Sequence, residues 1–283
     1  MSERLHKSNP IGRFSDRAAD YVKYRPSYPP EAIDAVLEGL TPSRGGTFRG
    51  PSRGAGFQPV RESRALQAAD VGAGTGISAK LLAERGVEVF AIEPNTEMRN
   101  AGEKVPSPNK EGGRVTWRDG TAEATGLADA SVDLVLCAQS YHWFEPVAAC
   151  LEFGRVLRPG GRLALMWNDA DESDPVAKGY YDLVRASSEG VGPTSHQTVA
   201  KEPRVEPPFA MSAMRRLRFR HEQRLDAEGL VGRAMSASYV PRTGEKAERL
   251  VEGLRRLHAE YVGADGCVGL VYGVWVYLNE PDQ

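Results

Sequence analysis

The residues with the clearest chemical potential form a glycine-rich run behind a short apolar segment. The run DVGAGTG, residues 70–76, places Gly72, Gly74 and Gly76 at alternate positions after Asp70. Glycine lets the backbone approach a ligand closely and take positive φ, and the helix that follows offers free amide donors. The run predicts a turn that binds an adenosine-bearing cofactor, although tight packing of a strand against a helix also selects glycine.

A second acid, Glu93, ends the next apolar segment 17 residues after Gly76. The two oxygens of a carboxylate there can accept hydrogen bonds from both hydroxyls of a ribose. Nicotinamide enzymes usually space their glycines as G-x-G-x-x-G, whereas this chain has G-x-G-x-G behind an acid. The spacing therefore weighs against a dinucleotide.

Three further stretches complete a family likeness: GTAE at 120–123, ASVD at 130–133 and RPGG at 158–161. They look like the G-D-A-E, S-F-D and R-P-G-G segments of the class I S-adenosylmethionine-dependent methyltransferases. With the glycine run and Glu93, they make residues 66–167 resemble that family closely. The resemblance implies an enzyme that uses S-adenosylmethionine as its methyl donor, and no metal.

The resemblance also implies a set of cofactor-binding residues. These are Asp70, Gly72, Gly74, Gly76, Glu93, Asn95, Met98, Thr121, Ala122 and Gln139. Thr121 departs from the family, which commonly has an Asp there that accepts a hydrogen bond from the adenine amino group. We expect adenine recognition to use the backbone amide of Ala122 and apolar walls, for which Asn95 and Met98 are candidates. Met98 is equally well explained as a core residue.

A narrower resemblance comes from residues 21–29, 140–144 and 236–241. They look like a small-molecule branch similar to trans-aconitate methyltransferase, in which the N-terminal segment closes over the cofactor cleft. Tyr21 and Arg25 would then contact the cofactor's carboxylate or an anionic substrate, because a guanidinium matches a carboxylate. The alternative for Arg25 is a solvated helix face.

His142 is the candidate catalytic residue, because it follows the fourth predicted strand and could take a proton near pH 7. Its neighbours Tyr141 and Trp143 could wall the sulfonium or the substrate with their ring faces. Packing plus substrate contact is the favoured alternative for His142, since an ionised carboxylate acceptor requires no base.

A parallel sheet is needed to bring these residues together. From residue 66 onward, short apolar runs alternate with segments of helical period, which predicts βαβ units. Strands are expected at 66–71, 87–93, 114–118, 132–138, 162–167, 214–221 and 268–278. The fold class is α/β: a Rossmann-like, doubly wound, mostly parallel seven-stranded sheet with an antiparallel inserted C-terminal strand, plus a helical cap. Continuous apolar character places 268–278 inside the sheet.

Helical spacing predicts helices at 30–40, from about Thr75, from Pro146, at 226–237 and at 247–261. In the helix from Pro146 we expect four buried side chains, which are Val147, Cys150, Leu151 and Leu157. That helix should stop at the turn formed by residues 159–161. Four prolines in 190–212 suggest a lid or a surface loop.

The chain divides into four predicted segments: an N-terminal cap segment (1–40), a flexible Gly/Arg-rich insertion (41–65), the methyltransferase core (66–167), and a variable cap with the C-terminal strands (168–283). The insertion is too poor in apolar residues to repay the entropy of ordering. Its five arginines leave a basic arm for nucleic acid as the alternative.

Composition limits the function classes. A 283-residue chain with 41% hydrophobic and 26% charged residues is globular, and its net charge of −2 weighs against a dedicated nucleic-acid binder. The segment AQSY at 138–141 also lacks the N/D-P-P-Y/F of nucleobase amino methyltransferases. Three separated cysteines weigh against disulfides and zinc and favour the cytoplasm. The start of the chain and its longest apolar run predict neither secretion nor a membrane span.

The predicted function is methyl transfer from S-adenosylmethionine to a small-molecule acceptor, with carboxylates among the candidates. The alternatives are an RNA or other nucleic-acid methyltransferase and a non-catalytic S-adenosylmethionine binder, with an NAD-dependent oxidoreductase less favoured. The sequence specifies neither the acceptor nor the oligomeric state.

Overall fold

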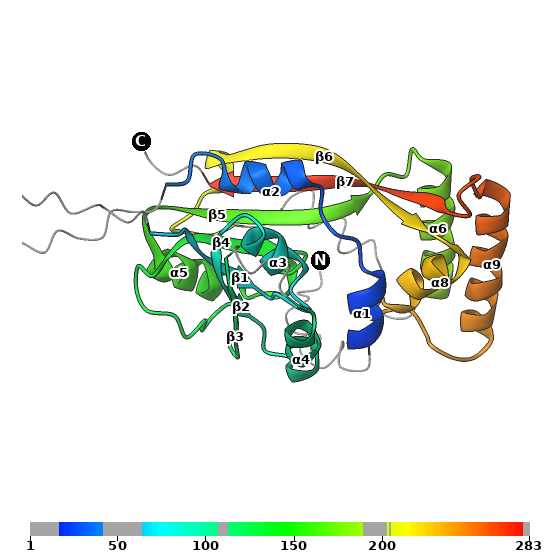
Figure 1. The fold of residues 1–283 in the computed structure, drawn as a ribbon, viewed down its shortest axis with the longest axis horizontal. Coiled ribbons are helices and arrows are strands. Elements are labelled where there is room, and N and C mark those ends of the chain that lie inside the picture. Colours follow the sequence, from blue (N-terminus) through cyan, green and yellow to red (C-terminus); the bar gives the residue numbers. More distant parts are fainter. Residues whose placement is uncertain (1–16, 42–63, 107–112, 189–202, 204, 280–283) are drawn as a thin grey trace, which may run out of the picture.

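The computed structural model describes residues 17–41, 64–106, 113–188, 203 and 205–279. Its centre is a seven-stranded sheet with the order β3-β2-β1-β4-β5-β7-β6 (Figure 1). The strands are β1 (Gln67–Val71), β2 (Glu88–Ile92), β3 (Val115–Arg118), β4 (Val132–Ala138), β5 (Leu157–Ala170), β6 (Met214–Leu225) and β7 (Val268–Asn279). Each strand expected from the sequence is present.

The first five strands are parallel, and β7 is inserted antiparallel between β5 and β6. Val274, Val276 and Leu278 of β7 are fully buried. This confirms the expected fold class, including a terminal strand inside the sheet. It also places the carboxyl ends of β1 to β5 at one edge, where ligands bind in such sheets.

Helices cover both faces of the sheet, because successive strand residues point to opposite sides. On one face, α5 (Pro146–Val156) packs Phe153 against Leu165 and Trp167. On the other face, α2 (Pro30–Leu37) and α3 (Ile77–Ala83) pack Ile33 and Leu82 against the sheet. The α4 helix (Thr96–Lys104) connects β2 to β3. The result is the three-layer, doubly wound arrangement that the sequence predicts.

A cap of three helices lies at the far end of β5, β6 and β7 (Figure 1). These helices are α6 (Pro175–Ser187), α8 (Ala227–Met235) and α9 (Glu245–Tyr261), and they share an apolar cluster with Tyr272 of β7. The short α1 (Ala18–Tyr24) contacts both α4 and α8. It therefore connects the cap with the edge of the sheet where ligands bind.

Two expectations for the α5 region are wrong. Val147 and Leu151 are 48% and 59% exposed, because the buried stripe of α5 is Ala149, Cys150, Phe153 and Val156. Two members of that stripe, Ala149 and Cys150, are small. The prediction gave more weight to the larger apolar side chains and so chose the wrong face of the helix. The segment 159–161 is no separate turn but part of an irregular start of β5, whose register with β4 shifts between Val132 and Leu134.

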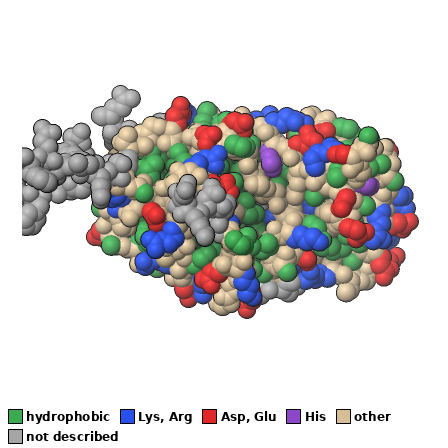
Figure 2. All heavy atoms as spheres, viewed as in Figure 1, with side chains coloured by type: hydrophobic (Ala, Val, Ile, Leu, Met, Phe, Trp, Pro, Cys, Tyr) green, Lys and Arg blue, Asp and Glu red, His purple; other side chains and the backbone are tan. Residues whose placement is uncertain are grey.

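The surface carries mixed charge on the face that Figure 2 shows, where acidic and basic side chains are interspersed. On α9, for example, Arg249 pairs with Glu245 and Arg256 pairs with Glu252. Within the described ranges, no helix combines the length and the apolar character needed to cross a membrane. The predicted insertion lies almost wholly outside the described residues, as does most of the 190–212 loop, so the four-segment division stays a prediction.

Candidate active site

A cavity of about 350 Å³ lies at the carboxyl ends of β1, β2, β3 and β4. Nine of the residues singled out in the sequence line it: Tyr21, Gly72, Gly74, Glu93, Met98, Thr121, Ala122, Gln139 and Trp143. The cavity is completed by Pro94, Glu123, Ser140, Phe144 and Glu145. Asp70, Gly76, Asn95, Arg25, Tyr141 and His142 do not line it.

The glycine turn gives the cavity its floor. Gly72 and Gly74 have φ of +68° and +59°, a region that residues with a Cβ rarely adopt. A Cβ on Gly72 would lie 2.6 Å from the Cβ of Ser140, and one on Gly74 would lie 3.4 Å from Met98 Cε. Gly76 does not line the cavity. It is the N-cap residue of α3, with a φ of +77°, and a Cβ there would lie 2.8 Å from the ring of Trp117.

Glu93 is held by two backbone amides. Gly74 donates to its Oε2 at 2.8 Å, and Asn95 donates to its Oε1 at 2.9 Å. Burial raises the pKa of Glu93, while these amides and the charge of Arg99 oppose the rise. Each oxygen keeps further acceptor capacity for a ligand hydroxyl. Asn95 itself caps α4 by accepting from the amide of Met98 at 2.9 Å.

Asp70 lies fully buried in β1, behind the turn. Its Oδ2 accepts from Ser78 Oγ at 2.7 Å, which ties α3 to the strand. Its Oδ1 has no hydrogen-bond partner among the described residues. Burial raises the pKa of Asp70 to about 7, and the bond from Ser78 opposes that rise. A buried acceptor without a partner is costly, so this oxygen is suited to an ordered water behind the turn.

The segment after β4 forms a second wall. Gln139 has a φ of +58°, which is uncommon for any residue but glycine and marks local strain. The short 3₁₀ helix Tyr141–Trp143 follows it. Tyr141 is 3% exposed and packs into the core, with its hydroxyl 3.3 Å from Cys150 Sγ. Nothing in the sequence predicts the positive φ of Gln139.

His142 is fixed by a neighbour from β5. The indole Nε1 of Trp167 donates to His142 Nδ1 at 3.2 Å. In a neutral imidazole, the nitrogen that accepts is unprotonated, so the ring hydrogen is on Nε2. The bond therefore sets the tautomer of His142.

The α1 helix covers one side of the cavity. Tyr21 lines it, and a Cβ on Gly74 would lie 3.8 Å from Tyr21 Cε1. Behind Tyr21, the guanidinium of Arg25 stacks at 4.5 Å from the ring centre and donates to the carbonyl of Ser236 at 3.1 Å. The two residues predicted to act together are thus in contact, although only Tyr21 reaches the cavity.

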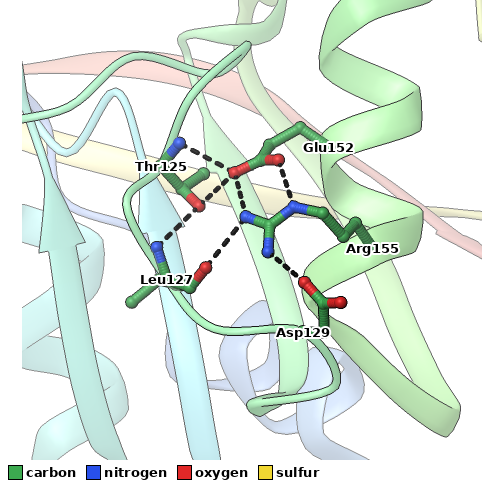
Figure 3. A network of polar contacts seen from close by, with 5 residues as sticks. All are labelled: Thr125, Leu127, Asp129, Glu152 and Arg155. Atoms are coloured by element: carbon green, nitrogen blue, oxygen red, sulfur yellow. Dashed lines mark hydrogen bonds and ion pairs between the residues drawn. The ribbon is translucent and has the colours of Figure 1, made fainter.

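A polar network supports the wall formed by residues 121–123. Glu152 of α5 accepts from both the amide and the hydroxyl of Thr125, at 2.9 and 2.6 Å (Figure 3). Arg155 donates to Glu152 at 2.7 Å, and it also binds the Leu127 carbonyl and Asp129. The network anchors the loop between β3 and β4 to α5 and so fixes the cavity wall that precedes it.

The cavity is negatively charged. Glu93, Glu123 and Glu145 line it, and its described lining includes neither lysine nor arginine. Glu145 also caps α5 by accepting from the amide of Ala148 at 2.8 Å. Such a lining favours a cationic ligand. Sequence reasoning passed over Glu145, although an acid directly before Pro146 is a typical start of a helix.

Comparisons with known proteins agree with this geometry. Residues 69–165 match the methyltransferase domain family. An uncharacterised methyltransferase of Mycobacterium tuberculosis is 40% identical over 159 residues, which are 56% of this chain and 53% of the relative. One of Schizosaccharomyces pombe is 35% identical over 167 residues, 58% of this chain and 56% of the relative. The chain thus matches about half the length of these curated relatives.

A solved structure from Anaeromyxobacter dehalogenans, named as a candidate type II methyltransferase, has the same fold. Its TM-score is 0.62 at 23% identity, and the alignment covers 91% of this chain and 98% of that one.

Proposed function

We propose that this chain, a class I S-adenosylmethionine-dependent methyltransferase by its fold and by the family match of residues 69–165, transfers a methyl group to a small-molecule acceptor. The observation that carries the proposal is the contact of Gly74 with Glu93 at a cavity on the ligand-binding edge of the sheet. The chain matches about half the length of its curated relatives, so the identity of the acceptor is part of the proposal.

The cavity residues fit this cofactor. Glu93 would accept from the ribose hydroxyls, and Thr121, Ala122 and Met98 would surround the adenine. The unpartnered Oδ1 of Asp70, which is fully buried behind the glycine turn, would accept from an ordered water there. The carboxylates of the lining suit a positively charged sulfonium. When bound, S-adenosylmethionine supplies an activated methyl group.

The chain's own contribution is alignment. Holding two reactants in attack geometry can supply ~7 to 11 kcal/mol. The wall formed by Ser140, Trp143 and Phe144 would exclude water and orient the acceptor beside the cofactor. Nδ1 of His142 accepts the hydrogen bond from Trp167, and the hydrogen of the neutral ring is on Nε2. Neither nitrogen is then ready to take a proton, so we expect an acceptor that needs no base, such as an ionised carboxylate.

Calorimetric titration with S-adenosylhomocysteine, beside NADH, tests the proposal. We expect micromolar binding of S-adenosylhomocysteine, weakened tenfold or more, about 1.4 kcal/mol, in Glu93→Ala. Glu103→Ala removes an exposed acid from α4 and serves as the matched control. Absence of binding to the wild-type protein, or a preference for NADH, would overturn the proposal.

We also propose a reducing, cytoplasmic location. All three cysteines are free: Cys137 and Cys150 are buried, and Cys267 is partly exposed. Unpaired thiols are typical of compartments in which glutathione keeps them reduced.

A further inference from the structure

A second cavity lies on the face of the sheet that α5 covers, where Phe90 packs against the same apolar cluster as Phe153. Its volume is about 340 Å³, and small-molecule sites have roughly 300 to 1,000 Å³. Its described lining shares no residue with that of the candidate active site. The lining residues are Gln67, Phe90, Arg118, Gly126, Leu127, Ala128, Ser131 and Arg158. None of them takes part in the function proposed above.

The second cavity is positively charged. Arg118 and Arg158 line it, and its described lining includes neither aspartate nor glutamate. The guanidinium of Arg118 lies 5.0 Å from the ring centre of Phe90, and within the described ranges it pairs with no carboxylate. Such a cavity favours an anion, in contrast with the acidic cavity of the candidate active site.

Unsatisfied polar atoms gather beside this charge. Arg64 Nη1, Ser131 Oγ and Arg158 Nη1 are buried and have no hydrogen-bond partner among the described residues. The two arginines share one acid, because Arg64 Nη2 donates to Asp133 Oδ1 at 2.8 Å and Arg158 Nη1 lies 3.2 Å from Asp133 Oδ2. A ligand that accepts hydrogen bonds would remove the cost of such unmet donors.

Arg158 is held in place before any ligand arrives. Its Nη2 donates to Gln67 Oε1 at 2.7 Å. Burial raises the pKa of Asp133, but the amide of Gln67 and the charges of Arg64 and Arg158 outweigh it and bring the pKa below its usual value. Asp133 is therefore a stable counter-ion that fixes Arg158. A guanidinium that is already positioned loses less entropy when it binds a ligand.

We propose that the second cavity binds a phosphate monoester. Arg118 and Arg158 would hold the phosphate, because the planar fork of arginine matches two phosphate oxygens and the bonds are charge-assisted. The hydroxyl of Ser131 would donate to a third oxygen. The organic part of the ester would pack against Phe90 and Leu127, which supply the apolar part of the lining.

The loop between β3 and β4 separates the two cavities. Residues 121–123 line the candidate active site, and residues 126–128 line the second cavity. Between these stretches, Thr125 is tied to Glu152 of α5 (Figure 3). Both cavities can therefore be occupied at the same time, and the proposal does not depend on the methyltransferase function.

Calorimetric titration of the full chain with phenyl phosphate tests the proposal, with inorganic phosphate and chloride compared at equal ionic strength. We expect saturable binding of phenyl phosphate, tighter than that of inorganic phosphate, because the phenyl ring would contact the apolar lining. Arg118→Gln should weaken this binding by about tenfold or more. Arg114→Gln is the matched control, because Arg114 is exposed just before β3 and pairs with Glu88 outside the cavity. Ser131→Ala should also weaken binding, and it keeps the test decisive if Arg118→Gln fails to fold.

The outcomes separate the sources of the anion. Phenyl phosphate binding that Arg118→Gln and Ser131→Ala leave unchanged, or no preference over chloride, would overturn the site. Tighter binding of inorganic phosphate would overturn the assignment to an ester. A second titration uses protein saturated with S-adenosylhomocysteine, where we expect the same affinity for phenyl phosphate. Competition between the two ligands would place the phosphate in the candidate active site and overturn the proposal. Failure to bind S-adenosylhomocysteine would count against the methyltransferase function alone, since the first titration needs no cofactor.

Discussion

The amide of Gly74 donates a 2.8 Å hydrogen bond to Glu93 Oε2. This bond joins the turn after β1 to the end of β2, two strands that are neighbours in the sheet. The backbone shape of the turn therefore sets the orientation of the acid. A change in either residue should disturb the part of the cavity that the other one forms.

We expect Gly74→Ala to weaken binding of S-adenosylhomocysteine by about tenfold or more, as measured by calorimetry. A φ of +59° costs a residue with a Cβ roughly 1 to 2 kcal/mol. The new Cβ would also lie 3.4 Å from Met98 Cε, at the cavity. Relief of the backbone strain would tilt the Gly74 amide away from Glu93.

Gly86→Ala separates strain from binding. Gly86 has a φ of +79°, and a Cβ there would meet nothing within 4 Å. Both variants should lose a similar unfolding free energy in urea, roughly 1 to 2 kcal/mol, but only Gly74→Ala should lose affinity. Equal affinities in the two variants would contradict a role of the Gly74 amide in the cofactor site.

Gly102→Ala should destabilise the protein by about 1 to 3 kcal/mol, although alanine usually stabilises a helix relative to glycine. The reason is that Trp117 lies directly against Gly102, and a Cβ there would also lie 3.0 Å from the carbonyl of Thr75. Urea unfolding measures the change. Trp117→Phe should recover part of the loss in a double-mutant cycle, and purely additive effects would rule out the proposed clash.

The sequence predicts the sheet well because strands that are buried on both faces consist of nearly continuous apolar runs, as in residues 132–138. Helix faces are harder to predict. On α5, Ala149 and Cys150 are buried while Val147 and Leu151 are exposed, because the face that packs on the sheet is the one that carries Phe153. The α6 helix was missed, although Asp174 and Pro175 form a typical helix start.

The same limit applies to the site. Motifs single out Gly74 and Glu93 because the contact between them depends on backbone shape and spacing within one βαβ unit. Glu145 lies at the cavity because α5 packs beside the loop that follows β3, and local sequence does not encode that packing. A residue of this kind becomes a candidate only from the three-dimensional structure.

Glu152→Gln should remove a pH-dependent part of the stability. Burial raises the pKa of Glu152, but hydrogen bonds from Arg155 and Thr125 outweigh it and bring the pKa to about 2, from 4.5. Because the folded-state pKa is depressed, the stabilisation is complete above pH 4.5 and is lost as the pH falls toward 2. This pKa difference corresponds to an upper bound of about 3.4 kcal/mol, which solvent screening at the partly exposed Arg155 reduces.

Urea unfolding of Glu152→Gln and wild type at pH 7 and at pH 2 to 3 tests this point. We expect a clear difference in the free energy of unfolding at pH 7, roughly 1 to 3 kcal/mol, that narrows in acid. Glu248→Gln, an exposed acid on α9, is the control and should change little at either pH. A difference that stays constant with pH would mean that the loss comes from packing and not from the ionised carboxylate.

His142→Gln should lower kcat by less than about tenfold with a carboxylic acid acceptor, because that acceptor arrives ionised. In the structure, Nδ1 of His142 accepts from Trp167 at 3.2 Å, so the neutral ring carries its hydrogen on Nε2. Taking a proton from an acceptor would require the bond to Trp167 to break first. The control is His258→Gln, which changes a partly exposed histidine of α9 that does not line the cavity and should leave the rate unchanged. A base role predicts instead a fall of about 10² to 10⁴ in kcat for His142→Gln, together with loss of the acidic limb of the pH–rate profile. In that case Trp167→Phe, which releases Nδ1, should raise the fraction of active enzyme, and the geometry described above would then be a resting arrangement.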